Sequence, residues 1–380
     1  MSLRRSIWRR RRSVASCDED RLAIATHWQL MGRKLRKHRL AMAGGYTLLA
    51  FYAIALAADF LAPYDPHDTH RDFPYAPPQA VRFVADDGFH LRPFVYGLTA
   101  YRHPETLRRI YTPDTRVRRP VRFFVRGHEY RVLGLAPCNV HLFGVDDGAP
   151  IFLLGTDKLG RDLFSRNLYA ARVSLTIGLV GVAISFVLGC VLGGVSGYFG
   201  GVADTLIQRL IEFLMCIPTL PLWMGLSAAL PKKWSPLGVY FGLTVILSVV
   251  GWCSLARVVR GKLLSLREED FVIAARISGA SSARIIGRHL IPSFLSYLIV
   301  SVTLAIPGMI LGETALSFLG LGIRPPAISW GVLLNDSQSL RAIAQCPWLL
   351  LPGAFVVIVV LAFSFLGDGL RDAADSQSVV

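Results

Sequence analysis

The sequence lacks the Gly-x-x-x-x-Gly-Lys-Ser/Thr segment with which many nucleotide-hydrolysing proteins cradle phosphates. Its six cysteines show none of the paired spacings that are typical of metal sites. Three of them lie in apolar runs, where they would pack as small hydrophobic side chains. These absences predict a chain with no catalytic residue, no metal site and no cofactor of its own.

Acidic residues are also scarce. The 26 Asp and Glu stand against 41 Lys and Arg, which gives a net charge of +15. Such an excess can indicate nucleic-acid binding, but the densest basic stretch, residues 1–40, directly precedes an apolar run. Basic residues in that position hold the preceding end of a membrane span in the cytoplasm, and anionic lipid attracts them. We therefore predict contact with membrane lipid and not with nucleic acid.

Apolar residues dominate the remainder. They make up 53% of the chain, and they cluster in blocks long enough to cross a bilayer. The fold prediction is an all-α polytopic membrane protein with six transmembrane helices and with both termini in the cytoplasm. The predicted spans are 41–61, 173–197, 207–230, 237–256, 294–316 and 347–366. Within the second span, Gly189, Gly193 and Gly197 form a small-residue ladder that is suited to tight helix contact.

The chain divides into a basic cytoplasmic segment 1–40, a first helix 41–61, an insert 62–171, a five-helix core 172–370 and a tail 371–380. The insert has no run of span length, and its short alternating stretches predict a small β-rich extracytoplasmic domain between the first two helices. Residues 121–126 alternate, and Gly127-His128 is read as the turn of a hairpin. Cys138 and Cys346 would lie on the same external side, so a disulfide between them is left open.

A polar, basic segment from 257 to 292 separates two apolar spans. Acids in a first turn predict a helix over 268–277, which Gly279 then ends. Ser281 and Ser282 offer a cap for a second helix, which runs through His289 and ends before Pro292. Two short helices joined at a glycine predict a docking site for a soluble partner, because small side chains allow a close approach.

The spacing of this segment carries a resemblance. Ala274-Ala275-x-x-x-Gly279, a nine-residue gap and His289-x-Ile291-Pro292 resemble the cytoplasmic Glu-Ala-Ala loop of ABC importer permeases. Ile273 stands where that family has Glu, and His289 and Ile291 replace its Ile and Leu. The resemblance implies that a separate ATPase docks here. It assigns the coupling contact to Ala274, Ala275, Gly279, His289 and Pro292.

Two further segments resemble one subgroup of these permeases. Its "GTDxxGRD" string matches Gly155, Thr156, Asp157, Gly160, Arg161 and Asp162. The residues that follow from Ala171 to Gly178 read "ARxSLxIG", and residues 315–331 contain "ALSFLGLG", "PP" and "SWG". This pattern is similar to the peptide and nickel importers, most of all to the second permease subunit of dipeptide and oligopeptide systems. Asp157 and Asp162 lack the further ligands that a metal site would need.

The resemblance implies a type I ABC importer permease in the inner membrane, forming half of a pathway for peptides. Its expected partners are a homologous second permease subunit, two ABC ATPase subunits that bind ATP and Mg, and an extracytoplasmic solute-binding protein. The insert would contact that binding protein or reinforce the core. Nickel, oligosaccharides and opines are alternative cargoes. An ATP-independent channel or carrier and a signalling membrane receptor are alternatives of another class.

An acidic residue inside a membrane span requires a structural or functional explanation, because inserting a central Asp into the bilayer costs about 2.5–3.5 kcal/mol on insertion scales. We expect Glu313, and to a lesser degree Glu212, to line the pathway or its gate. Both lie near predicted span ends, where a structural role is the competing interpretation. Pro218 and Pro221 are expected to kink a helix beside the same passage, and simple packing is an equal alternative.

Overall fold

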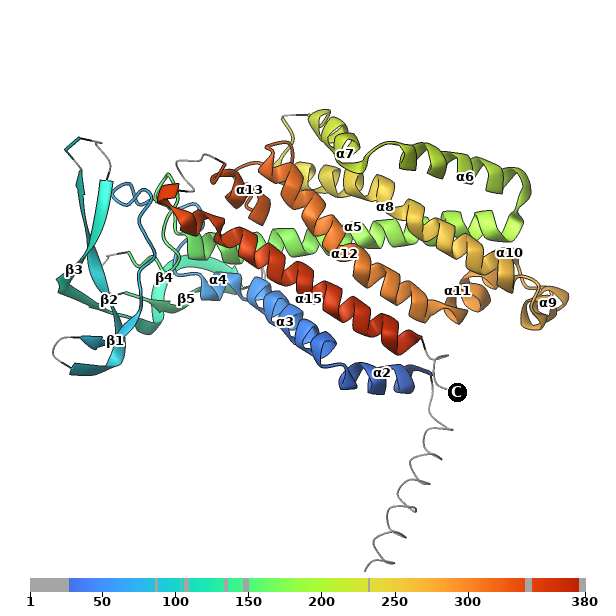
Figure 1. Ribbon diagram of the computed structural model, residues 1–380, viewed down its shortest axis with the longest axis horizontal. Helices are drawn as coiled ribbons and strands as arrows, with labels where there is room; N and C mark the ends of the chain where they lie inside the picture. Colours follow the sequence, from blue (N-terminus) through green and yellow to red (C-terminus); the bar gives the residue numbers. More distant parts are fainter. Residues whose placement is uncertain are drawn as a thin grey trace, which may run out of the picture.

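The computed structural model describes residues 27–85, 88–102, 104–105, 109–132, 136–145, 150–231, 233–338 and 344–375. Most of the predicted basic segment, residues 1–26, and the last five residues of the predicted tail lie outside this range. The described chain forms an elongated bundle of helices with β-strands at one end and short helices at the other (Figure 1).

Five helices in the described chain are long and apolar enough to cross a membrane, and a bent pair accounts for a sixth crossing if it is one span. The five are α3 (Arg39–Leu56), α5 (Leu163–Phe199), α8 (Pro236–Leu266), α12 (Leu295–Phe318) and the helix formed by η2 (Pro347–Leu350) with α15 (Leu351–Ala374). The bent pair consists of α6 (Gly201–Cys216) and α7 (Thr219–Ala228). The short helices are α2 (His27–Lys37), α4 (Ala58–Leu61), α9 (Asp270–Ile277), α10 (Ser282–Arg284), η1 (Ile285–Leu290), α11 (Ile291–Ser293) and α13 (Trp330–Asn335).

The third predicted span, 207–230, is bent at the prolines that the sequence singles out. α6 and α7 meet at an angle of 89° across Ile217 and Pro218. Pro218 lacks the amide hydrogen that would continue the helix, and residue 217 is extended with φ −89° and ψ 128°. The run from Ile217 to Pro221 contains no charged residue, so the prolines and not the hydropathy mark the break in the sequence.

Helix boundaries also extend beyond the predicted spans. α5 begins at Leu163, so the end of the predicted insert is already helical. Asp162 caps it, because its carboxylate accepts a hydrogen bond from the amide of Ser165 at 2.8 Å. α8 continues to Leu266 and therefore takes up the first ten residues of the segment that was read as a loop.

The insert is β-rich, as expected. Strands β1 (Arg82–Ala85), β2 (Gly88–Arg102) and β3 (Arg109–Pro120) form an antiparallel sheet, and β4 (Arg122–Val132) pairs with β5 (Ala136–Gly144). The predicted turn at Gly127-His128 is wrong, because both residues lie inside β4, where the register with β5 shifts between Arg126 and Tyr130. A glycine inside a strand marks such an irregularity as readily as it marks a turn.

The main hydrophobic core lies where α3, α5, α8, α12, α13 and α15 meet, around buried residues such as Leu175, Leu247 and Ile310. The glycine ladder of α5 provides the tight contact that was predicted. A Cβ on Gly193 would lie 2.5 Å from the carbonyl oxygen of Ala256, and one on Gly197 would lie 2.8 Å from that of Arg260. α5 and α8 therefore pack with their backbones in close approach.

The two described ends of the chain lie at the end of the bundle that is opposite the β-strands (Figure 1). α2 and the last turns of α15 are neighbours, and the His38 ring lies 3.7 Å from the carboxylate of Asp372. The β-strands occupy the opposite end. No disulfide joins Cys138 to Cys346 among the described cysteines.

Candidate functional site

The segment from α9 to α11 forms the tip of the bundle opposite the β-strands (Figure 1). α9 is shorter than the predicted helix and begins at Asp270. It ends in a Schellman motif, in which the amide of Gly279 donates to the carbonyl oxygen of Arg276 and the amide of Ala280 donates to that of Ala275, both at 3.0 Å. Gly279 has φ +79°, which explains why glycine stands at this position.

The second helix of this segment is longer than predicted. The Ser281 hydroxyl caps it by accepting from the amide of Arg284 at 3.4 Å, as the sequence indicates. The chain then continues through η1, which contains His289, and through α11, which contains Pro292. The expected end before Pro292 is therefore wrong, because proline is tolerated in the first turn of the short helix α11.

The outer face of α9 carries apolar side chains in contact with solvent. Ile277 is 82% exposed, and Phe271 and Ile273 are both more than 40% exposed. Ala274 is exposed beside them, and nothing lies within 4 Å of the position that a Cβ on Gly279 would take. An apolar face with small residues at its centre is suited to contact with another protein.

The inner face of α9 is tied to the spanning helices. Val272 is fully buried in a cluster with Val259 and Leu263 of α8, Cys190 of α5 and Ile285 of η1. A displacement of α9 would therefore be transmitted to α5 and α8 through packed side chains, because densely packed interiors resist compression.

Arg276, on α9, also lies 5.8 Å above the ring of Tyr198, near the end of α5. This contact adds a second connection between α9 and α5. It places the basic residue at the end of α9 against an aromatic ring that belongs to a spanning helix.

An ion pair that sequence inspection had missed lies at the same end of the bundle. Arg260 of α8 donates from Nε and Nη2 to the two carboxylate oxygens of Asp204 in α6, at 2.5 and 2.6 Å. The hydroxyl of Ser196 in α5 donates to the same carboxylate at 2.5 Å. This bidentate contact holds α5, α6 and α8 together beside α9.

The Gly-Thr-Asp segment lies at the other end of the bundle and is largely buried. Asp157 is fully buried, and its carboxylate accepts from the amides of Leu159 and Arg161 at 2.8 and 3.0 Å and from Nε of Arg161 at 2.6 Å. Nη1 of the equally buried Arg166 donates to the same carboxylate. Asp336, near the end of α13, lies 3.7 Å from both arginines and 2.8 Å from Lys158. The segment therefore forms an internal ion network.

The glycines and the threonine of this segment bind the chain that follows α4. The Thr156 hydroxyl donates to the carbonyl of Phe73 at 2.6 Å and accepts from the amide of Ala76 at 2.7 Å. Gly160 has φ +75°, and a Cβ there would lie 2.1 Å from the carbonyl oxygen of His70. A Cβ on Gly155, at φ +78°, would lie 2.7 Å from the carbonyl oxygen of Ala76 and 2.9 Å from the Trp348 ring. These residues join the insert to the helical core.

Asp162 lies just outside the spanning helix α5, which it caps. Burial raises the pKa of this carboxyl to about 6, although hydrogen bonds from Ser165 act in the opposite direction. No group of three or more His, Cys, Asp or Glu in the described part of the chain is arranged to hold a metal ion. The Gly-Thr-Asp segment is therefore a structural junction in this chain.

Glu313 is fully buried and does not reach the surface of this chain. Its carboxylate accepts from the hydroxyls of Ser174 in α5 and Ser317 in α12, at 3.2 and 2.8 Å. The Ser174 hydroxyl in turn accepts from the amide of Trp330 at the start of α13. This arrangement favours the structural interpretation, and a role of Glu313 at the pathway stays a prediction.

The other predicted pathway residues lie on α6 and α7. Glu212 is about half exposed and pairs with Arg209 at 2.8 Å. Pro218 and Pro221 are exposed at the 89° break. α7 contacts α12 beside Glu313, since a Cβ on Gly312 would lie 2.8 Å from the Trp223 ring. Glu313 is buried, whereas Glu212, Pro218 and Pro221 are exposed.

Sequence inspection missed Asp336, the role of Arg166 and the Asp204–Arg260 pair. Neither Arg166 nor Arg260 stands out in the sequence, because both lie outside the predicted apolar spans, in segments that contain other charged residues. No local pattern identifies the distant acids that pair with them.

Residues 185–377 match a family described as binding-protein-dependent transport system inner membrane component. Residues 26–78 match the N-terminal transmembrane domain of oligopeptide transport permease C. Strands β1 to β5 lie outside both matched ranges.

Three curated relatives are similar to this chain over 59% of its length. A dipeptide transport system permease protein of Bacillus subtilis is 41% identical over 225 residues, which cover 68% of that relative. An oligopeptide transport system permease protein of the same organism is 36% identical over 224 residues and 71% of its length. The oligopeptide permease protein of Haemophilus influenzae is 40% identical over 224 residues and 70% of its length.

Proposed function

This chain belongs to the family of binding-protein-dependent transport system inner membrane components, and we propose that it is the permease subunit of an ATP-driven importer for peptides. It would form half of the translocation pathway in a cell inner membrane. The observation that carries the proposal is the family match over the helical core, together with relatives named for dipeptide and oligopeptide transport.

We propose that α9 is the docking site of a separate ABC ATPase subunit, which binds ATP and Mg. Its exposed apolar face and the open surface at Gly279 support this role. Its buried face supports coupling, because Val272 packs against α5 and α8. Closure of two ATPase subunits on ATP would move α9 and, with it, the spanning helices. The differential binding of ATP by the ATPase would thus shift the permease between its conformations.

The remaining partners follow from the same proposal. A homologous second permease subunit would complete the pathway, and an extracytoplasmic solute-binding protein would deliver the peptide at the end that carries the β-strands. Both described chain ends and α9 would be cytoplasmic. The basic residues near the end of α2, Lys34, Arg36 and Lys37, would then lie at the anionic lipid surface.

The break between α6 and α7 supports a place for Pro218 beside the pathway or the second subunit. Non-helical backbone at membrane depth is tolerated only where protein covers it or where it lines a water-filled cavity. Ile217 has extended backbone and Pro218 is exposed in this chain, so we propose that one of these two environments covers them in the assembled transporter.

The proposal is tested by purifying the tagged chain in mild detergent and identifying the proteins that accompany it. We expect a P-loop ATPase and a second permease. The Gly279→Glu variant should lose the ATPase and keep the second permease, because a long charged side chain would stand on the docking face.

A matched Gly279→Asn variant controls for the backbone, because asparagine tolerates a positive φ. It should retain the ATPase better than the Glu variant does. A chain that purifies alone and moves solute through vesicles without ATP would overturn the proposal in favour of a channel or carrier.

A further inference from the structure

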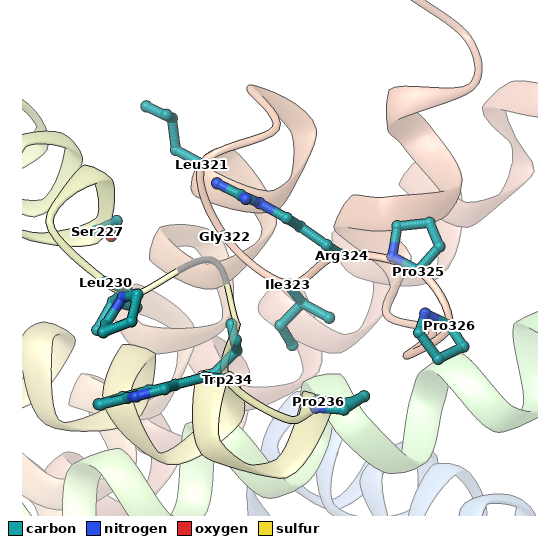
Figure 2. Close-up of a pocket in the computed structure, with 12 residues that line it drawn as sticks. Ser227, Leu230, Trp234, Pro236, Leu321, Gly322, Ile323, Arg324, Pro325 and Pro326 are labelled. Carbon is teal, nitrogen blue, oxygen red and sulfur yellow. The ribbon is translucent and has the colours of Figure 1, made fainter.

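Two neighbouring cavities lie where α12 turns into α13, and they share Ile323, Arg324 and Pro325 in their walls. One has a volume of about 220 Å³ and is lined by cations. The other, of about 150 Å³, is lined mainly by apolar side chains (Figure 2). We propose that together they bind the C-terminal residue of a peptide, with the carboxylate in the cationic cavity and the side chain in the apolar one.

The charge of the first cavity favours an anion. Lys158, Arg161, Arg166 and Arg324 line it, and Asp336 is the one carboxylate among its lining residues. Asp157, which is paired with Arg161 and Arg166, compensates a second charge. Two positive charges are left over, and within the described residues no carboxylate lies at ion-pair distance from Arg324.

Arg166, one of the residues that line this cavity, has an unused donor. Arg166 is about 1% exposed, and its Nε atom is buried without a hydrogen-bond partner, although Nη1 contacts Asp157 and Asp336. A buried donor without a partner costs free energy, which an incoming acceptor would recover. A carboxylate supplies such an acceptor and the missing negative charge at once.

The apolar cavity distinguishes a peptide from a simple anion. Trp234 and four prolines, Pro231, Pro236, Pro325 and Pro326, line it. In Figure 2 the Trp234 ring lies below the cavity, and the Arg324 side chain reaches across above it toward Leu321. Rigid proline and aromatic walls suit a hydrophobic side chain. The terminal residue of a peptide carries such a side chain on the carbon that bears the carboxylate.

The wall between the cavities is held in place. The amide of Ile323 donates to the Ser317 hydroxyl at 3.0 Å, and that hydroxyl donates to the buried Glu313 at 2.8 Å. A Cβ on Gly322 would lie 2.5 Å from the Ser317 hydroxyl, so the chain is in close contact with α12 there. A wall that is already ordered loses little freedom on binding, which favours affinity.

The site is tested on the full chain in lipid nanodiscs by ligand-observed NMR with the tripeptide Ala-Ala-Phe and its C-terminal amide. We expect the acid to bind about ten-fold more tightly than the amide, because a hydrogen bond to a charged group is worth at least that factor. Arg324→Gln should reduce this ratio to below about two-fold. Trp234→Ala should weaken both forms by a similar factor and leave their ratio unchanged.

Lys262→Gln serves as the matched control, since Lys262 is a cation on α8 that lies above the ring of Tyr297. It should change neither affinity. Equal binding of acid and amide by the natural chain would overturn the proposal, and so would an unchanged ratio in Arg324→Gln. Acetate that competes as strongly as the peptide acid, with no effect of Trp234→Ala, would reduce the site to a general anion pocket and would also overturn it.

The inference rests on the proposed peptide transport, but the two can fail separately. A complex that contains the ATPase and imports peptides without distinguishing acid from amide would refute the site and leave the function standing. Absence of the ATPase would refute the function, and the ratio of acid to amide affinity could still be measured on the chain alone.

Discussion

The two ends of the helical bundle differ in which residues they bury and which they expose. At the end near the β-strands, the Gly-Thr-Asp segment turns its charges inward, and Asp157 and Arg166 are almost completely buried against each other. At the other end, α9 turns apolar residues outward, and Ile277 is 82% exposed. The first arrangement pairs Asp157 and Arg166 within this chain, whereas the second leaves apolar side chains open to the proposed ATPase.

This difference shows that two segments of one chain, which resemble motifs of the same family, meet two different physical requirements. Buried charges must be matched by partners in the same chain, because an unpaired charge in a low-dielectric interior is very costly. Exposed apolar and small residues are matched by a second molecule. Substitutions at the first end should therefore affect stability, and those at the second end should affect association.

The largest effect is expected for Asp157→Asn. It would leave Arg166 with only the more distant Asp336 as its counter-ion, and breaking a buried pair costs about 3–5 kcal/mol. The free energy of unfolding, measured by denaturant titration in mixed micelles, should fall by that amount. The control is Glu212→Gln, which removes an exposed pair and should cost less than about 1 kcal/mol. Equal losses in the two variants would contradict a buried network.

Gly160→Ala should have the next largest effect. Its positive φ and its approach to the His70 carbonyl combine backbone strain with a steric clash, for about 2–4 kcal/mol in total. Gly279→Ala meets the same strain in open space and should cost only about 1–2 kcal/mol. The comparison fails if Gly279→Ala proves the more damaging change to the melting temperature.

The carboxyl of Asp162 should make stability depend on pH. Its pKa is about 6 in the folded chain and 3.8 in the reference state, so the folded state binds the proton more tightly. The contribution of this group is therefore most favourable below about pH 4 and is lost as the pH rises through about 6, by about 2–3 kcal/mol.

Asp162→Asn has no charge to bury, so its free energy of unfolding relative to that of the natural chain should increase between pH 4 and pH 6. Taking the difference in free energy of unfolding between the variant and the natural chain removes the pH dependence that the other groups contribute equally to both. A difference that is independent of pH would show that Asp162 does not titrate in this window.

Ile277→Asp should have the smallest effect on stability. The side chain is on the surface, so its replacement should change the free energy of unfolding by less than about 0.5 kcal/mol. The same variant should lose the ATPase in co-purification, because a charge would be buried at the docking face. Retention of the ATPase would remove α9 from the proposed contact.

Local signals predicted some elements well. The end of α9 at Gly279 and the cap at Ser281 are confirmed, because a positive φ and a capping hydroxyl act within a few residues. The glycine ladder of α5 is also confirmed, because its four-residue spacing places the glycines on one face of the helix; only the structure shows that α8 packs against that face. The turn at Gly127 is wrong, since a glycine inside a paired strand produces the same local pattern as a glycine in a turn.

Long-range partners could not be predicted in this way. Asp336 completes the Gly-Thr-Asp network from a helix far along the chain, and Asp204 meets Arg260 across two helices. The sequence marks Glu313 as an acid in an apolar run, but only the structure shows that it accepts hydrogen bonds from the hydroxyls of Ser174 and Ser317.

The sequence by itself determined that this chain crosses a membrane, where its apolar spans lie, and which short segments resemble a permease. These properties depend on composition and spacing. Transfer energies and local backbone preferences act on composition and spacing directly, without help from distant residues. Only the tertiary structure decided which charges are paired, which glycines touch a neighbouring backbone and which face of α9 stays open. Those properties depend on residues that are distant in the chain, and folding brings them together through packing.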